Sequence, residues 1–146
     1  MRLRTILPAL LLLAALIFPV VTTPARAQET GKRKVFQVSM VSWKFTPSII
    51  TVNQGDTVVL QIENEDPDKR NHSIAARLFM RNQATATGEF RTGTAEERQF
   101  FAVEPGKKFE LTFTASERGT FPFVCGVFDH ASRGMTGAIN VLAPAP

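Results

Sequence analysis

Short segments rich in β-branched and aromatic residues, each ended by a turn signal, recur along most of this chain. Residues 35–40 (VFQVSM) alternate polar with apolar side chains, the pattern of a strand with one buried face. Pro47 and the polar cluster at 53–56 are breaks between further strands. The strands expected after the first cover residues 48–52, 57–63, 108–114, 120–125 and 137–142. Short strands at this spacing predict an all-β chain folded as an antiparallel sandwich or barrel.

The strand pattern weakens between Arg77 and Phe101. Thr94 and the glutamate at Glu97 match a capping box, so we expect at most one short helix there. The rest of this stretch is expected to be loop. Twelve phenylalanines and one tryptophan are available to fill a core between the strands.

Residues 1–27 have the features of a secretory signal peptide. A basic start (MRLR) precedes an apolar run at residues 6–21, and PARA ends in an A-x-A pattern, so cleavage is expected after Ala27. An uncleaved membrane anchor is the alternative, because the apolar run approaches the length that spans a bilayer. After this segment we expect a flexible tail, one domain and a short C-terminal tail, at residues 28–34, 35–142 and 143–146. The chain is therefore predicted to be periplasmic or secreted.

The charge of the processed chain argues against nucleic acid as a partner. The full sequence has 17 basic and 13 acidic residues, but Arg2, Arg4 and Arg26 lie in the signal segment. Without them the net charge is +1, and the chain has no run of basic residues interleaved with aromatics. We expect a monomer with one hydrophobic core and no membrane span after cleavage.

Four residues with metal-binding side chains stand out because such residues are scarce here. The sequence contains one cysteine and two histidines; Cys125, His130 and Met135 fall close together, and His72 begins an expected strand. A single cysteine in an exported chain cannot form an internal disulfide, so we expect its thiol to be buried or metal-bound. Two imidazoles and a thiolate suit a borderline or soft ion, and a thioether favours copper over zinc. Together these residues predict a site for one copper ion.

Each of these residues also has an ordinary structural explanation. A lone cysteine or methionine is often a core residue, and a histidine can lie on a polar loop or at a strand edge. The spacing Cys-x4-His-x4-Met favours a metal site, because a loop leaving a strand can bring three such side chains together without a helix. A structural sandwich in which these residues are coincidental is the alternative.

The sequence resembles the cupredoxins, or blue copper proteins, a family that includes plastocyanin, azurin and auracyanin. The resemblance covers nearly all of residues 35–142 and is carried by FTPSIITVNQGDTVVLQIENED, NHSIAA, VEPGKKFELTFTASERGTFPFVCG and DHASRGMTGAINV. It implies a Greek-key β-sandwich with copper bound near one end. It also implies the copper ligands, which are His72, Cys125, His130 and an axial Met135.

The resemblance further implies a one-electron carrier that cycles between Cu(II) and Cu(I) and docks transiently with redox partner proteins. In such a carrier Cys125 supplies the strong thiolate bond, His72 is the buried imidazole, and His130 is partly exposed toward the partner. Phe128, Phe79 and Met80 are candidates for an apolar docking surface around His130. The alternative is a copper-binding or copper-delivery protein without redox cycling, because the same ligands can hold Cu(I) for transfer.

An enzyme is not expected. A multicopper oxidase needs further histidines for its trinuclear cluster, and a dinuclear copper centre needs a second cysteine, which this chain lacks. Zinc hydrolysis would need an open coordination position and a general base, whereas Met135 favours copper.

Four positions depart from the family pattern. Ser73 follows the upstream histidine where many members have asparagine, and Gly126 follows the cysteine where many have a hydroxyl residue. Phe128 and Asp129 precede His130 where an azurin-like sequence has Pro-Gly. No ligand is lost, but residues around the ligands tune the potential and rigidity of such a site. The charge of Asp129 is expected to favour Cu(II) weakly.

Overall fold

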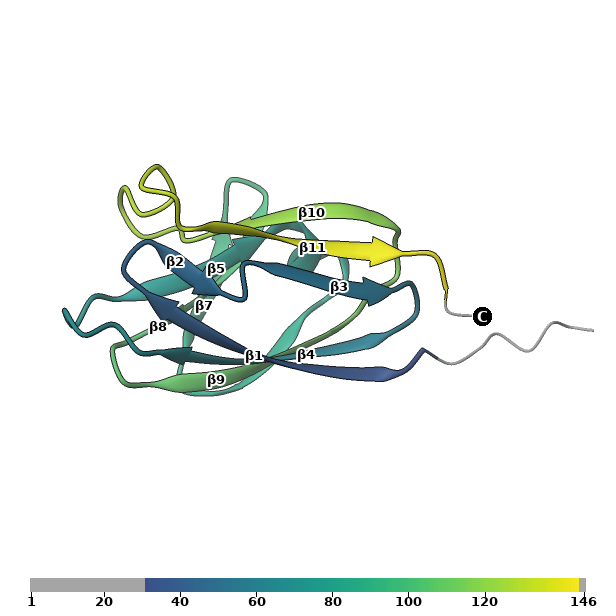
Figure 1. The fold of residues 1–146 in the computed structure, drawn as a ribbon, viewed down its shortest axis with the longest axis horizontal. Coiled ribbons are helices and arrows are strands. Elements are labelled where there is room, and N and C mark those ends of the chain that lie inside the picture. Colours follow the sequence, from purple (N-terminus) through teal and green to yellow (C-terminus); the bar gives the residue numbers. More distant parts are fainter. Residues whose placement is uncertain (1–30, 145–146) are drawn as a thin grey trace, which may run out of the picture.

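The computed structural model describes residues 31–144, which form two β-sheets packed face to face (Figure 1). The first sheet, in spatial order, contains β2 (Lys44–Thr46), β1 (Arg33–Val41), β4 (Thr57–Asn64), β9 (Lys108–Thr114) and β6 (Thr85–Gly88). The second contains β3 (Ile49–Asn53), β11 (Thr136–Leu142), β10 (Gly119–Val124), β5 (His72–Ala76), β8 (Arg98–Val103) and β7 (Arg91–Ala95). One five-residue helix, α1 (Arg77–Arg81), follows β5. The predicted all-β sandwich is confirmed.

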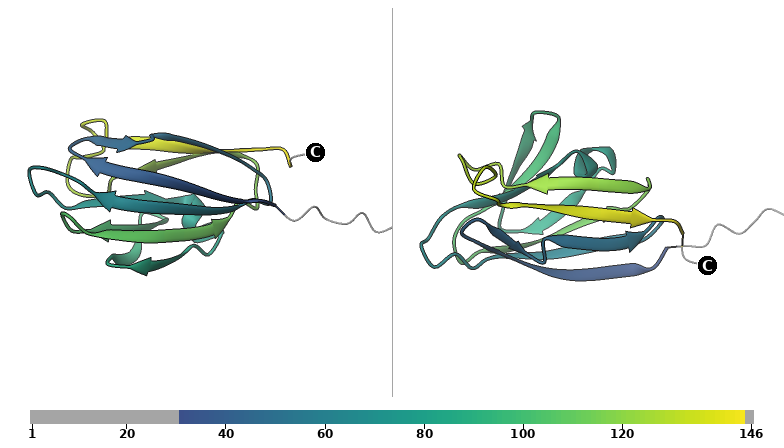
Figure 2. Two further views of the ribbon diagram at one scale, coloured as in Figure 1. Left: turned by 60° about the horizontal axis from the view of Figure 1, so that its bottom comes forward. Right: turned by 45° about the horizontal axis from the view of Figure 1, so that its top comes forward.

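Two strand pairs are parallel, although the sequence pattern predicted an antiparallel sandwich. β1 runs parallel to β4, and β3 runs parallel to β11. The left panel of Figure 2 shows β1, β4 and β9 side by side in the first sheet. β2 and β3 lie between β1 and β4 in the sequence but belong to different sheets, so the chain crosses to the second sheet before it returns beside β1. Alternation of side chains marks a strand but does not reveal the direction of its neighbour.

The helix expected near Thr94 is absent, and these residues form the β7–β8 hairpin instead. Thr94 pairs with Gln99, while Glu96 and Glu97 form the turn with left-handed backbone angles, φ +49° and +58°. Further along β8, Phe101 is buried in the core. Burial of this side chain in a strand outweighs a weak local preference for a helix. The stretch predicted as loop therefore contains α1, β6, β7 and β8.

The first strand begins earlier than predicted. β1 includes Arg33 and Lys34, which pair with Thr57 and Val58 of β4, so the end of the expected flexible tail belongs to the sheet. The predicted signal peptide lies outside the described residues. Within residues 31–144, no helix is long and apolar enough to cross a bilayer.

Aromatic side chains fill much of the space between the sheets. Phe101 packs near Phe79, Phe90 and Phe109, with ring centroids 6.1, 5.8 and 6.0 Å away. These rings come from β8, α1, β9 and the segment between β6 and β7, so they join elements of both sheets. These edge-on, tilted and stacked ring pairs add to the stabilisation that burial alone provides. The core therefore gives the sandwich a rigid base for its loops.

The sandwich brings distant segments together at one end. β5 and β10 are antiparallel and pair only at Ala75 and Val124, so Cys125 follows β10 beside the start of β5, where His72 lies. In Figure 1 the β10–β11 loop, the β4–β5 loop and the β1–β2 turn all lie at this left-hand end. Three loops from both sheets can therefore contribute side chains to one place.

We predict that Phe101→Ala lowers the free energy of unfolding by about 3–5 kcal/mol, because it leaves a cavity among packed rings. The matched substitution Phe128→Ala should change it by less than about 0.5 kcal/mol, since Phe128 is 98% exposed. Denaturant unfolding of both variants measures the difference. Equal losses would contradict this description of the core.

Candidate metal centre

Three of the four predicted ligands converge at the end of the sandwich. The Sγ atom of Cys125 lies 3.9 Å from Nδ1 of His72 and 3.4 Å from Nδ1 of His130. One ligand atom from each residue lies within 4.8 Å of the others, and all three residues are buried. His72 is the first residue of β5, Cys125 directly follows β10, and His130 lies in the β10–β11 loop.

This donor set fits one copper ion. First-row metal bonds of about 2.0 Å to nitrogen and about 2.3 Å to sulfur place donors about 3.7 Å apart in a trigonal set. The two nitrogen–sulfur distances in the structure, 3.9 and 3.4 Å, lie on either side of that value. Two imidazoles and a thiolate are also the ligand types that trigonal copper sites use. His72, Cys125 and His130 therefore form a compact site whose size and chemistry suit copper.

Met135 lies beside this cluster at the base of the ligand loop. Its side chain is fully buried, its carbonyl oxygen accepts a hydrogen bond from the Cys125 amide at 3.0 Å, and its own amide donates to the His130 carbonyl at 3.0 Å. These two bonds tie Met135 to the backbone of both other residues of the Cys-x4-His-x4-Met segment. The loop is thus a closed, internally hydrogen-bonded unit.

Ser73 links the two segments that carry the cluster. Its amide donates to the Cys125 Sγ atom at 3.4 Å, and its hydroxyl oxygen accepts a hydrogen bond from the Gly126 amide at 2.8 Å. The departures from the family pattern at Ser73 and Gly126 therefore still leave a hydrogen-bonded link between the two segments. This amide contact also helps to fix the position of the Cys125 sulfur.

Asp66, in the β4–β5 loop, holds the far side of the His72 ring. Its Oδ2 atom lies 2.6 Å from Nε2 of His72, and both side chains are fully buried. Burial raises the pKa of Asp66, but hydrogen bonds from His72, Ser42 and the Asp68 amide outweigh burial and hold that pKa below its usual value. The carboxylate therefore orients the ring so that Nδ1 faces the cluster.

Trp43 covers His130, contrary to the prediction that this histidine is partly exposed. His130 is only 5% exposed, and the Trp43 ring meets it edge to face with centroids 4.7 Å apart. The guanidinium groups of Arg70 and Arg133 lie 5.2 and 4.7 Å from the Trp43 ring. The β1–β2 turn, where Trp43 has a φ of +65°, places the indole over the site. Burial is the main factor that lowers the pKa of His130, and the nearby His72 adds to this.

Charges beside His130 are largely paired. The Asp129 carboxylate accepts a hydrogen bond from Nε of Arg133 at 2.7 Å, and this contact is the main cause of the lowered pKa of Asp129. The expected influence of Asp129 on a metal is therefore reduced by its cationic neighbour. Of the three candidate docking residues, Phe128 is 98% exposed and Met80 is 43% exposed, whereas Phe79 is fully buried in the core and cannot form a surface.

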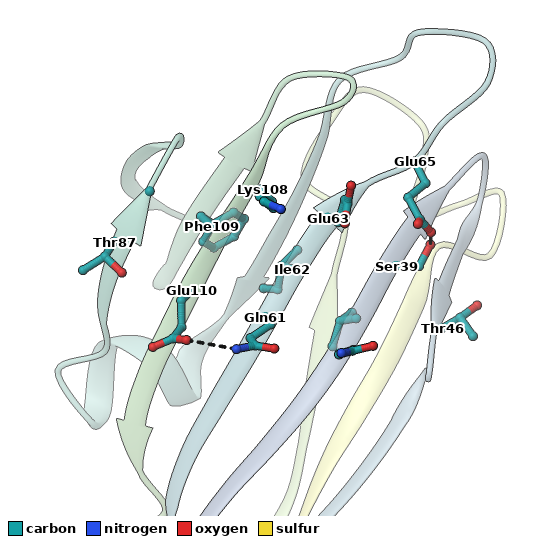
Figure 3. A pocket seen from close by; sticks show the side chains of 13 residues that line it. Ser39, Thr46, Gln61, Ile62, Glu63, Glu65, Thr87, Lys108, Phe109 and Glu110 are labelled. Carbon is teal, nitrogen blue, oxygen red and sulfur yellow. Dashed lines mark hydrogen bonds between the residues drawn. The ribbon is translucent and has the colours of Figure 1, made fainter.

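A surface hollow on the first sheet is separate from this centre. Figure 3 shows its lining on β1, β4 and β9, where Gln61 donates to Glu110 at 3.3 Å. None of the four predicted ligands lines it. We therefore assign it no part in metal binding.

Sequence patterns did not predict that Asp66 and Trp43 are neighbours of the site. Asp66 lies in the polar loop before His72, and Trp43 is the only tryptophan. The closeness of Asp66 to His72 in the sequence and the presence of a single tryptophan are the signals that could have indicated these two residues. Their contacts depend on the folded positions of the β4–β5 loop and the β1–β2 turn, which local sequence does not reveal.

The fold and the cluster together define a β-sandwich protein with a site for a single copper ion. The chain belongs to the family of cupredoxin-like domains, whose family description matches residues 10–137. The family prediction is thereby confirmed.

Individual relatives agree with this membership. The copper-resistant cuproprotein CopI of Pseudomonas aeruginosa is 26% identical, and the match covers 94% of this chain and 97% of that protein. The dithionite-reduced auracyanin of Roseiflexus castenholzii is 19% identical, with a TM-score of 0.58 over 80% of this chain and 100% of that one. A blue copper oxidase of Nitrosomonas europaea is 23% identical, with a TM-score of 0.58 over 79% of this chain and 40% of that one. At these identities the two structures show a shared fold.

We predict that Ser73→Ala lowers the free energy of unfolding by about 1–2 kcal/mol, because the Gly126 amide loses its acceptor. Ser132→Ala is the matched control, since the Ser132 hydroxyl donates to the Asp129 carbonyl on the exposed side of the same loop. Chemical denaturation of the metal-free proteins measures both. If Ser132→Ala lowers the free energy of unfolding as much as Ser73→Ala does, the hydrogen bond between Ser73 and Gly126 has no particular structural role.

The lowered pKa of His130 predicts a pH dependence of the metal-free protein. The unfolded chain takes up this proton near pH 6.5, before the folded chain does, so acid favours unfolding. Stability should fall as the pH decreases from about 6.5, at up to about 1.4 kcal/mol per pH unit for one proton. His130→Gln should reduce that slope in denaturant titrations. An unchanged slope would show that His130 does not cause the pH dependence of stability.

Proposed function

We propose that this protein is an exported one-electron carrier that holds one copper ion and cycles it between Cu(II) and Cu(I). The observation that carries the proposal is the buried convergence of His72, Cys125 and His130. A carrier works best when its ligands need little rearrangement between the two oxidation states. A closed loop and a sandwich core provide such rigidity.

His72, Cys125 and His130 would hold the ion, with Met135 as a weaker fourth ligand. The copper ion supplies the one-electron step between its two oxidation states. Ser73 and the fold keep the Cys125 sulfur facing both imidazoles. Burial of the cluster keeps water away from the sulfur and from the ring nitrogens.

Contact with a redox partner would occur at the loop end of the sandwich. Because Trp43 covers His130, the contact surface would include the indole as well as the exposed loop around Phe128. We propose transient docking there, with the protein itself a monomer. Export to the periplasm or outside the cell is supported by the signal-like N-terminal sequence.

Catalysis is not part of the proposal. The sequence contains only two histidines, and both belong to the cluster. No further histidines are available for a trinuclear copper site, although some proteins with this fold are named as oxidases.

Copper binding without redox cycling is the second candidate. Burial of all four proposed ligands suits retention of the ion, and a relative of nearly the same extent is named as a copper-resistant cuproprotein. In that case the same ligands would hold Cu(I) for storage or transfer.

Copper loading distinguishes the candidates. We predict an intense visible absorption band, caused by the bond between Cys125 and Cu(II), and a reversible voltammetric couple. Cys125→Ser should abolish the band. Tight Cu(I) binding without a reversible couple would favour the second candidate, and absence of copper binding would refute both.

Two buried methionines provide a matched control for the fourth ligand. Met135→Leu should raise the midpoint potential, because loss of a thioether donor destabilises Cu(II) more than Cu(I). Met40, on β1, is equally buried, so Met40→Leu should leave the potential unchanged. Equal shifts would argue against Met135 as a ligand.

A further inference from the structure

Asp66 and His72 form a buried carboxylate–imidazole pair directly behind the metal centre. The Oδ2–Nε2 distance is 2.6 Å, and both side chains are completely inaccessible to solvent. The other ring nitrogen, Nδ1, faces the Cys125 sulfur. Any change in the electron density of this ring is therefore transmitted to the position that a metal would occupy.

The carboxylate is held in place by several further contacts. The Ser42 hydroxyl donates to Oδ2 at 2.8 Å, and the Asp68 amide donates to Oδ1 at 2.7 Å. The Arg70 guanidinium lies 3.7 Å from Oδ1 and donates to the Ser42 oxygen at 2.7 Å. Asp66 thus has partners on both oxygens, as a buried carboxylate requires.

We propose that Asp66 is a positioning residue that stabilises Cu(II) relative to Cu(I) by acting through His72. This inference rests on the proposed copper function. The Nε2–H group donates to the carboxylate, which fixes the tautomer and leaves the Nδ1 lone pair free for the metal. The negative charge also makes Nδ1 a stronger donor, and a stronger donor favours the more highly charged ion. Because the pair is buried, solvent screens this effect weakly.

The first test compares removal of a buried and an exposed carboxylate in the same loop. Asp66→Asn should raise the midpoint potential and weaken Cu(II) binding by about 10–100-fold, with a smaller loss for Cu(I). Glu65→Gln is the control, since Glu65 is the exposed neighbour of Asp66. Its carboxylate accepts a hydrogen bond from the Ser39 hydroxyl and has no contact with His72 among the described hydrogen bonds. It should leave both quantities nearly unchanged. Equal effects of the two variants, or no effect of Asp66→Asn, would overturn the inference.

A second variant should shift the midpoint potential in the opposite direction without changing the charge of the protein. Ser42→Ala removes one of the two donors to Oδ2, so more of the carboxylate charge is available to His72. The midpoint potential should then decrease. This variant also keeps the inference testable if Asp66→Asn does not fold. An increase, or no change, would contradict the proposed action through His72.

The metal-free protein provides a readout that does not depend on redox activity. In ¹⁵N NMR spectra, His72 should be protonated at Nε2 and unprotonated at Nδ1, with an Nε2–H proton at low field that exchanges slowly with solvent. The opposite tautomer would overturn the inference. If copper binds without a reversible couple, the electron-carrier proposal fails, and this tautomer together with the Cu(II) affinity of Asp66→Asn still decides the role of Asp66.

Discussion

The metal centre depends on the meeting of the β5 start with the β10 end. A single residue pairing, Ala75 with Val124, and the hydrogen bonds between Ser73 and the Cys125–Gly126 segment fix this contact. Ser73 and Gly126, for example, are 53 positions apart in the sequence. Without this contact, His72 would have no fixed relation to the loop that carries the other candidate ligands. The core between the sheets matters for function because it holds β5 and β10 in that arrangement.

Side chains from two neighbouring loops complete the site from the outside. Asp66 fixes the ring of His72, Trp43 covers the ring of His130, and Ser42 and Trp43 are adjacent in the β1–β2 turn. One short turn therefore contacts the surroundings of both histidines. Such contacts restrict ring rotation, and Trp43 also shields the ring of His130 from water. Both effects suit a protein whose ligands must keep one geometry while the charge of the bound ion changes.

The sequence predicts most strands of the sandwich and the candidate ligands, for physical reasons that can be named. Alternating side chains marked most strands of the sandwich, and the scarcity of metal-binding residues drew attention to His72 and Cys125. The β7–β8 hairpin was mistaken for a helix because burial of Phe101, a tertiary effect, decides its structure. The burial of His130 and the role of Asp66 also could not be predicted, since both arise from loops that meet only in the folded protein.

The central claim is that the fold prearranges the donors before any metal binds. Crystal structures of the metal-free and copper-loaded forms, with copper located by anomalous scattering, test it most directly. The account predicts one copper ion bound by Nδ1 of His72, Nδ1 of His130 and Sγ of Cys125, with the two rings in the same orientations in both forms. Copper bound elsewhere, or large rotation of either ring on binding, would contradict it.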